Sequence, residues 1–178
     1  EGGAASSGWP AYTPLSTEEF SPGTGQDLWI LGLHLTSLSS LSLAQGKRAR
    51  LWRLLYGHGP GNGTLMVLPL DQGLEHGPTD FFPNPPALDT SFQFRLAVEG
   101  RFSAIALGVG LAEKYMGEHA GRIPLILKLN GKTNIADDAE AVSPAFASVE
   151  DAVRLGADAV GYTVYVGSPR QDVEIREY

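Results

Sequence analysis

Short apolar runs alternate with helix-like segments along the chain from residue 47 onward. Four runs have the length and apolar character of buried strands: residues 65–70, 104–107, 123–129 and 159–166. Three segments between or beside them read as helices: residues 92–98, 111–119 and 148–155. Strands that alternate with helices in this way are typical of parallel β/α units in an α/β fold. Such folds place their chemistry at the carboxyl ends of the strands.

The helix expected over 148–155 has the clearest start. Ser148 is a common N-cap residue, and Glu150 and Asp151 suit the positive end of the helix dipole. Gly156 ends the segment. Residues 169–178 read as the beginning of one more helix. Four β/α units cannot close an eight-unit barrel, which needs about 250 residues. The pattern therefore indicates either an open four-stranded sheet or half of a larger barrel.

The first 46 residues differ in composition from the rest. About half of them are Gly, Ser, Thr or Pro, and Lys47 is the first basic residue of the chain. We expect residues 1–46 to form a loop-rich leader of uncertain structure, with 1–25 lacking regular structure, and residues 47–178 to form the main domain. Apolar residues at helical spacing predict a helix within 47–56. Its four basic residues are expected to form a solvated face or, alternatively, a phosphate or partner contact.

Composition excludes several classes of protein. The 178 residues carry a net charge of −7, which does not suit a general nucleic-acid binder. Cysteine is absent, so disulfides, thiolate metal sites and a cysteine nucleophile are excluded; a cytoplasmic location is expected. The apolar stretch 28–44 is interrupted by polar residues and is shorter than the roughly 20 residues of a membrane span. We therefore expect no membrane contact.

The first candidate site follows the run 65–70. Asp71 stands at the end of this expected strand, and Glu75 and His76 follow in a loop bounded by glycines, with Gly77 next. A carboxylate and an imidazole there could act as acid and base. Alternatively, Asp71 caps a turn and His76 is a surface residue. A metal site is not expected, since no second histidine cluster supports it.

The second candidate is Lys128, which lies inside an apolar run. Buried lysines are rare and are usually paired or functional. Lys128 could be a Schiff-base amine or the electrostatic partner of one, or it could point inward and pair with Asp71 or another carboxylate. Asn130 and Lys132 follow at the strand exit, where they could bind hydroxyl or phosphate groups, or simply form a turn around Gly131.

The third candidate is the segment 161–168. Strand alternation would place Tyr162, Val164 and Val166 on one face, and Thr163 and Tyr165 on the other. Ser168 stands at the expected exit and suits a ligand contact. For the tyrosines, core packing is favoured over catalysis. We expect Asp71, Lys128 and either Tyr162 or Thr163 to converge at one end of the strands.

Together these motifs resemble the class I fructose-bisphosphate aldolases of the archaeal and bacterial DhnA type, in the DeoC/LacD superfamily. The likeness rests on these segments, in order: DQGLEHGP at 71–78, DFFPNP at 80–85, GLAEKY at 110–115, LILKLNGKT at 125–133 and GYTVYVGS at 161–168. The resemblance implies a TIM barrel with about four of its eight β/α units in this chain. It also implies Schiff-base cleavage of fructose 1,6-bisphosphate to dihydroxyacetone phosphate and glyceraldehyde 3-phosphate, without metal or cofactor.

By this resemblance, Asp71 and Lys128 are expected to be catalytic, and His76 to contact substrate. The further substrate-binding candidates are Gly77, Asn130, Lys132, Tyr162 and Ser168. The family's Schiff-base lysine lies on the sixth strand, and Lys47, Lys114, Lys128 and Lys132 do not match it. We therefore expect this chain to be the N-terminal portion of an aldolase, inactive alone and with exposed apolar surface. The full-length protein is expected to form a homo-oligomer.

Two alternatives stay open at this stage. Relatives in the superfamily use the same barrel for other aldol chemistry, such as transaldolase-like synthases or a thiolase. The missing nucleophile also fits a non-catalytic half-barrel that acts as an interaction module.

Overall fold

The computed structural model describes residues 38–71, 73–75, 77, 79, 82–135 and 137–178. The expectation of an unstructured arm at 1–25 therefore lies outside the described residues, as does His76. The described part begins with a 3₁₀ turn, η1 (Leu38–Ser40), and the helix α1 (Gln45–Trp52). It then runs through four β/α units to a last helix, α5 (Gln171–Glu177).

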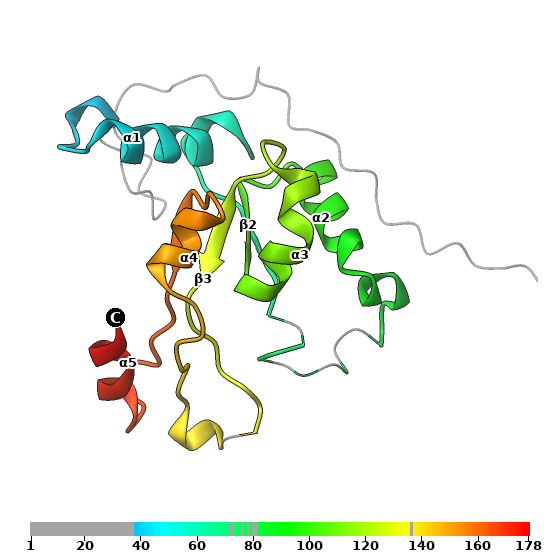
Figure 1. The fold of residues 1–178 in the computed structure, drawn as a ribbon, viewed down its shortest axis with the longest axis vertical. Coiled ribbons are helices and arrows are strands. Elements are labelled where there is room, and N and C mark those ends of the chain that lie inside the picture. The colour runs from blue at the N-terminus through cyan, green and yellow to red at the C-terminus, as the bar shows by residue number, and fades with distance from the viewer. Residues whose placement is uncertain (1–37, 72, 76, 78, 80–81, 136) are drawn as a thin grey trace, which may run out of the picture. The chain divides into compact units, whose positions relative to one another are not determined.

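Four short parallel strands form one sheet, in the order in which they follow along the chain (Figure 1). They are β1 (Val67–Pro69), β2 (Ala104–Leu107), β3 (Leu125–Lys128) and β4 (Ala159–Gly161). The connections contain α2 (Thr90–Glu99), α3 (Val109–His119) and α4 (Val149–Arg154), with 3₁₀ turns η4 (Pro85–Leu88) and η5 (Asp138–Glu140). The alternation of strands and helices predicted from the sequence is confirmed.

The core lies between one face of the sheet and the helices. Ile105, Leu107, Leu125 and Leu127 alternate along β2 and β3 and are buried against side chains of α2, α3 and α4, among them Phe94. Ile126 and Lys128 alternate to the opposite face and stay only half-buried. The sheet thus separates an apolar core from a face that can carry chemistry.

Helix starts follow the sequence signals. Asp89 caps α2 by accepting a hydrogen bond from the Ser91 backbone N–H. Ser148 caps α4, as the sequence predicted, and Asp151 completes a reciprocal capping box with it. Both caps satisfy backbone N–H groups that have no partner within the helix.

The basic stretch near residue 50 forms α1 and a following π-helical turn, η2 (Arg53–Gly57). Leu54 and Leu55 of this turn are buried. Arg53 forms an ion pair with the buried Asp158 at 3.0 Å, and Arg50 donates to the carbonyl of Ala157. Both arginine side chains remain exposed to solvent, as a solvated face requires, and they also fasten η2 and α1 to the segment that enters β4.

Strand β4 is shorter than predicted. The apolar run 159–166 contains paired strand residues only from Ala159 to Gly161. Beyond that point the backbone of Thr163 pairs with the side chain of Asn130, and Val166 folds back to bond Val164. The alternation of faces predicted for 162–166 is therefore wrong, because a side chain replaces the neighbouring strand.

Within the part of the chain that the structure describes, no helix is long and apolar enough to cross a membrane.

Candidate active site

The register of the sheet brings Asp71 and Lys128 into one row. Pro69 pairs with Ala106, Leu107 pairs with Leu127, and Lys128 pairs with Gly161. If the same register is continued beyond the strand ends, Asp71 lies opposite Gly108, which follows β2, and Gly108 lies opposite Lys128. Residues in one row of a parallel sheet point to the same face. Because glycine stands between them, no side chain separates the carboxylate from the ammonium.

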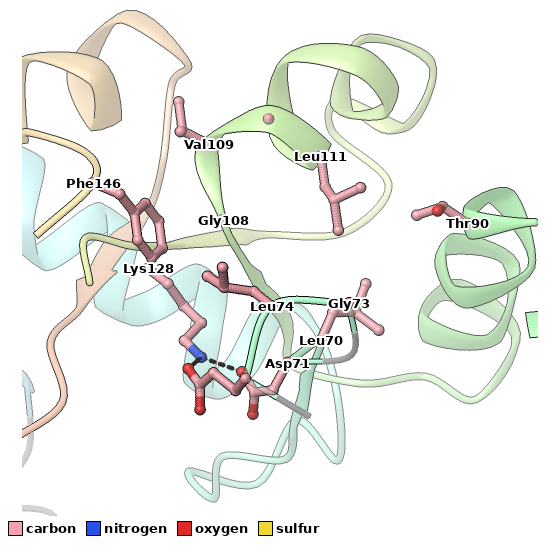
Figure 2. A pocket seen from close by; sticks show the side chains of 12 residues that line it. Leu70, Asp71, Gly73, Leu74, Thr90, Gly108, Val109, Leu111, Lys128 and Phe146 are labelled. Atoms are coloured by element: carbon pink, nitrogen blue, oxygen red, sulfur yellow. Dashed lines mark hydrogen bonds and ion pairs between the residues drawn. The ribbon is translucent and has the colours of Figure 1, made fainter. Parts of the chain in front are cut away.

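Lys128 is held by two carboxylates rather than one. Its ammonium forms ion pairs with Asp71 and with Glu75, the second at 2.5 Å (Figure 2). The three side chains are 14%, 25% and 13% exposed, respectively, so water screens the charges only partly. Burial alone would lower the pKa of Lys128, but the hydrogen bonds to Asp71 and Glu75 outweigh it and raise the pKa above its ordinary value. Lys128 is therefore a charged ammonium at neutral pH.

Lys128, Asp71 and Glu75, referred to below as the triad, line a pocket of about 440 Å³ at the carboxyl end of the sheet (Figure 2). Loops after β1 and β3 and the start of α3 line it, with Leu70, Asp71, Gly73, Leu74, Glu75, Thr90, Gly108, Val109, Gly110, Leu111, Lys128 and Phe146. Most of the lining is apolar, while Lys128, Asp71 and Glu75 supply its charge. A mostly apolar pocket with a few convergent polar groups is typical of small-molecule sites.

Two parts of this lining have no counterpart among the site residues predicted from the sequence. Phe146 lies in the connection between β3 and α4, and its position depends on backbone bonds from Phe146 and Ala147 to the carbonyl of Leu129. Val109 and Leu111 begin α3, whose N-cap is Gly108 without a side-chain cap. Loop residues of this kind give no periodic signal; only the rule that pockets lie at strand ends points to them.

Glycine at position 131 allows the two loops above the pocket to meet. A Cβ atom at Gly131 would lie 2.9 Å from Phe146 Cε1, 3.1 Å from Glu75 Oε1 and 3.1 Å from Leu74 Cδ2. Any side chain there would push at least one of these groups away. Gly131 therefore lets Glu75 reach Lys128, which gives this residue a packing role beyond the expected turn.

Other predicted site residues lie outside the pocket lining. Gly77 has a left-handed backbone (φ 74°), and a Cβ there would come 3.0 Å from the side-chain nitrogen of Asn134. Lys132 forms an ion pair with Asp138, whose side chain is exposed. The hydrogen bond to Asp138 raises the pKa of Lys132. Substrate contacts by Gly77 and Lys132 remain predictions.

Asn130 is fully buried, and its side-chain amide bonds to backbone groups of two loops. Its amide nitrogen donates to the carbonyls of Ser143 and Thr163, at 3.0 and 2.7 Å, and its oxygen accepts from the Thr163 N–H at 2.8 Å. Asn130 thus joins the loop after β3 to the loop after β4. This structural role explains why an asparagine stands at position 130 without invoking a ligand. Substrate binding by Asn130 remains a prediction.

Tyr162 and Ser168 also have partners within the fold. The Tyr162 hydroxyl donates to the carbonyl of Glu174, and the ring packs edge-on against Tyr178. Ser168 donates to the carbonyl of Ala141. The sequence predicts that Asp71, Lys128 and either Tyr162 or Thr163 converge. The structure brings Asp71 and Lys128 together in an ion pair, whereas the hydroxyl of Tyr162 is directed to α5. Ligand contacts by Tyr162 and Ser168 remain predictions.

Glu174 is an unpredicted element of this end of the fold. Its side chain is fully buried, and its two carboxylate oxygens accept hydrogen bonds from the backbone N–H groups of Ser143 (2.7 Å) and Tyr165 (2.8 Å). Glu177 accepts a further bond from Ala145. The acidic face of α5 therefore holds both loops at the carboxyl end of the sheet.

Among the described residues, no group of three or more histidine or acidic side chains is arranged to hold a metal ion.

A family model for the DeoC/LacD aldolases matches residues 65–177, which include all four strands and the complete pocket. The chain belongs to the DeoC/LacD aldolase family. The α/β fold with about four of the eight units of a TIM barrel is thereby confirmed, together with the resemblance that suggested it. This DeoC/LacD chain carries its charged triad at the strand ends, where barrel enzymes of every chemistry hold their sites.

Curated relatives of this DeoC/LacD chain carry aldolase names. The "Fructose-bisphosphate aldolase class 1" of Thermoproteus tenax is 50% identical over 106 residues, which cover 60% of this chain and 39% of the relative. The "Probable fructose-bisphosphate aldolase class 1" of Chlamydia muridarum is 39% identical over 124 residues, which cover 68% of this chain and 36% of the relative. The chain thus spans about two fifths of the length of these relatives.

Solved structures agree with the fold. An archaeal fructose-1,6-bisphosphate aldolase, solved with its catalytic lysine bound to the carbinolamine intermediate of the substrate, superposes with a TM-score of 0.62 and 43% identity. That match covers 71% of this chain and 49% of the archaeal chain. The aldolase of Slackia heliotrinireducens has a TM-score of 0.64 at 22% identity, over 79% of this chain and 48% of that protein, and supports the fold alone.

Proposed function

We propose that this chain carries one half of the active site of a class I fructose-bisphosphate aldolase, which cleaves the bisphosphate through a Schiff base without a metal. The observation that carries the proposal is the Lys128–Asp71–Glu75 triad in a pocket at the strand ends. The names of the relatives support the choice of reaction. Fructose 1,6-bisphosphate is the proposed substrate, and the full-length protein is proposed to be a cytoplasmic homo-oligomer.

Lys128 serves as an electrostatic group and not as the nucleophile. A Schiff base forms only from a neutral amine, whereas the two carboxylates raise the pKa of Lys128 and keep it protonated. Its positive charge lowers the pKa of a neighbouring amine by like-charge repulsion and can donate a hydrogen bond to a substrate oxygen. Asp71 orients the ammonium and can accept a proton from a substrate hydroxyl.

The nucleophile itself lies outside this chain in this proposal. Among the described lysines, only Lys128 lines the pocket. Lys132 bonds to Asp138, and Lys114 lies over the ring of Tyr115. We expect the isolated chain to be inactive and to contribute the substrate-facing end of the first four barrel strands.

Borohydride trapping tests the role of Lys128. The chain is incubated with dihydroxyacetone phosphate, reduced, and analysed by intact and peptide mass spectrometry. We expect no adduct on Lys128. An adduct that maps to Lys128 would contradict both its assignment as an electrostatic group and the expected inactivity.

A hybrid enzyme tests the reaction. Residues 65–177 of this chain replace the matching segment of the Thermoproteus tenax aldolase, and cleavage of fructose 1,6-bisphosphate is followed by a coupled dehydrogenase assay. We expect activity in the hybrid, a loss of at least about 100-fold in kcat for Lys128→Met, and little change for Lys114→Met, the matched lysine control. A folded hybrid without cleavage activity would contradict the proposal.

A second candidate reaction comes from a relative in Methanocaldococcus jannaschii, 32% identical over 124 residues and named "Fructose-bisphosphate aldolase/6-deoxy-5-ketofructose 1-phosphate synthase". The same hybrid, assayed for synthesis of that ketose phosphate, separates the two activities. A non-catalytic half-barrel remains the alternative of another class, and a hybrid that is stable and inactive towards both substrates would favour it.

A further inference from the structure

The two carboxylates on Lys128 differ in how firmly the fold holds them. Asp71 is the second residue after β1 and follows the buried Leu70, which donates its backbone N–H to the carbonyl of Ala106. Glu75 instead lies on a tight turn, closed by a bond from Gly73 N–H to the Gly77 carbonyl. Both glycines have left-handed backbones, φ 89° and 74°. The sheet therefore fixes Asp71 directly, whereas Glu75 is held by this turn and by a bond from its own N–H to the Asp71 carbonyl.

The charge of the empty site does not suit the proposed substrate. One ammonium and two carboxylates sum to a net charge of −1 in the pocket. A sugar phosphate brings further negative charge, and its oxygens need a positive group that is free to bind them. With both carboxylates in place, Lys128 has no net attraction left for an anionic oxygen.

We propose that Glu75 is an exchangeable counter-ion of Lys128, which holds the ammonium in the empty pocket and gives up its place to an oxygen of a phosphate-bearing ligand. This inference rests on the proposed function for its ligand class. Asp71 stays bound throughout and keeps the ammonium oriented. Glu75 thereby sets the affinity of the pocket for anions.

The Glu75 carboxylate lies at the wall of the pocket, where an entering ligand can contact it. Its carboxylate reaches Lys128 through the gap left by Gly131, where a Cβ would meet Glu75 Oε1, Leu74 and Phe146. All three neighbours are side-chain atoms that line the pocket or the triad. A ligand that enters the pocket therefore contacts Glu75 together with Leu74 and Phe146.

Titration with inorganic phosphate tests the proposal. Calorimetry measures the Kd of the full chain and of Glu75→Gln, and heteronuclear NMR of labelled lysines reports whether the Lys128 signal shifts. Removing the competing charge should tighten phosphate binding about tenfold. Glu113→Gln makes the same change of net charge at a residue that pairs with the exposed Arg154, and it should leave the Kd unchanged.

A double variant separates exchange on Lys128 from a general effect of charge. In Glu75→Gln/Lys128→Met, the gain in phosphate affinity should disappear. Gly131→Ala provides a variant that keeps every charge but crowds Glu75, and it should tighten phosphate binding in the same direction as Glu75→Gln. Thermal unfolding of each variant identifies those that fold.

Two results would overturn the inference. The first is equal phosphate affinity in the native chain and a folded Glu75→Gln variant, including no detectable binding in either. The second is a gain that persists in the double variant. Failure of the proposed function gives a different result, in which Glu75→Gln tightens phosphate binding but the hybrid enzyme cleaves no fructose 1,6-bisphosphate.

Discussion

Asp71 and Lys128 lie 57 residues apart in sequence and form an ion pair across the position of Gly108, which belongs to the chain between them. The pair therefore connects the ends of two strands that are not neighbours in the sheet. Because it requires β1, β2 and β3 to be in register, it reports on the correct assembly of the sheet as well as on the chemistry of the pocket.

Replacing Lys128 should reveal the repulsion between its partners. In Lys128→Met, Asp71 and Glu75 face each other without a cation at a partly buried position. We expect a loss of about 2 kcal/mol in the free energy of unfolding, measured by urea denaturation at pH 7. Lys114→Met, at a lysine that lies over Tyr115, should cost less than about 1 kcal/mol. Equal losses in the two variants would contradict this account.

Alkaline pH should remove the contribution of this ion pair. The pKa of Lys128 is raised above the ordinary lysine value of 10.5, because the hydrogen bonds to Asp71 and Glu75 outweigh burial. A raised lysine pKa stabilises the fold fully below the unfolded-state pKa, and this contribution is lost as pH rises through the folded-state pKa. The difference in unfolding free energy between the native chain and Lys128→Met should therefore be constant up to about pH 10 and then shrink. A constant difference at higher pH would show that the pair contributes nothing through its charge.

Protonation of His119 should lower the free energy of unfolding in acid. Burial lowers the pKa of His119 below 6.5, and Arg122 lowers it further. The ring stacks on Phe94 at 4.8 Å, and its Nδ1 has no hydrogen-bond partner among the described residues. Stability from a depressed pKa is present above the unfolded-state value and is lost as pH falls through the folded-state value.

We expect the pH dependence of unfolding below pH 6.5 to become shallower in His119→Phe, while stability at pH 8 changes by less than about 1.5 kcal/mol. Part of the slope should remain, because burial and Arg53 also lower the pKa of His58. An unchanged slope in the variant would exclude His119 as its source.

Glu174 should be more important for stability than its neighbour Glu177. Glu174→Gln leaves one acceptor oxygen and turns an NH₂ group toward a second backbone donor, so it should cost about 2 kcal/mol. Hydrogen exchange at the amides of Ser143 and Tyr165 should accelerate, since both bond to this carboxylate. Glu177→Gln affects an exposed bond to Ala145 and should cost less. Unchanged protection of both amides in Glu174→Gln would contradict the prediction.

Two left-handed glycines offer a matched test of close packing. Gly59 (φ 65°) would place a Cβ 2.1 Å from Ser103 Oγ, whereas Gly156 (φ 69°) has nothing within 4 Å of that position. Gly156→Ala should therefore cost only the backbone strain, about 1 kcal/mol, while Gly59→Ala should cost about 3 kcal/mol or more. Thermal unfolding of both variants measures the difference, and equal midpoints would show that the segment around Gly59 gives way.

The fold was predictable from the sequence where local signals and packing agree. The strand predicted at 104–107 coincides with β2, because all four of its residues are buried and read as one apolar run. The N-cap of α4 at Ser148 was equally visible. Strand β4 ends earlier than its apolar run, because Asn130, 33 residues away, takes over the pairing of Thr163. No window of neighbouring residues contains that information.

The candidate site was predictable only in part, because local sequence signals point to Asp71 and Lys128 but not to Phe146 or to the contact of Glu75 with Lys128. Asp71 and Lys128 stood out because a charged residue at the end of, or inside, an apolar run is unusual. Pairing between them was one of the alternatives that the sequence left open, and the structure shows it. Glu75 completes the triad only because Gly131, on another loop, leaves room for it. Phe146 enters the pocket through tertiary contacts alone, so no local sequence pattern indicates it.

The amide of Asn130 has the same donor and acceptor groups as a peptide unit, and it pairs with Thr163 as a neighbouring strand would. The loop after β4 is thereby anchored through a side chain rather than through a further strand residue. Because Leu129 and Ser143 fix both ends of the excursion between them, insertions or deletions within residues 132–140 should leave the sheet and the pocket in place. This segment is the natural position at which the chain can vary in length.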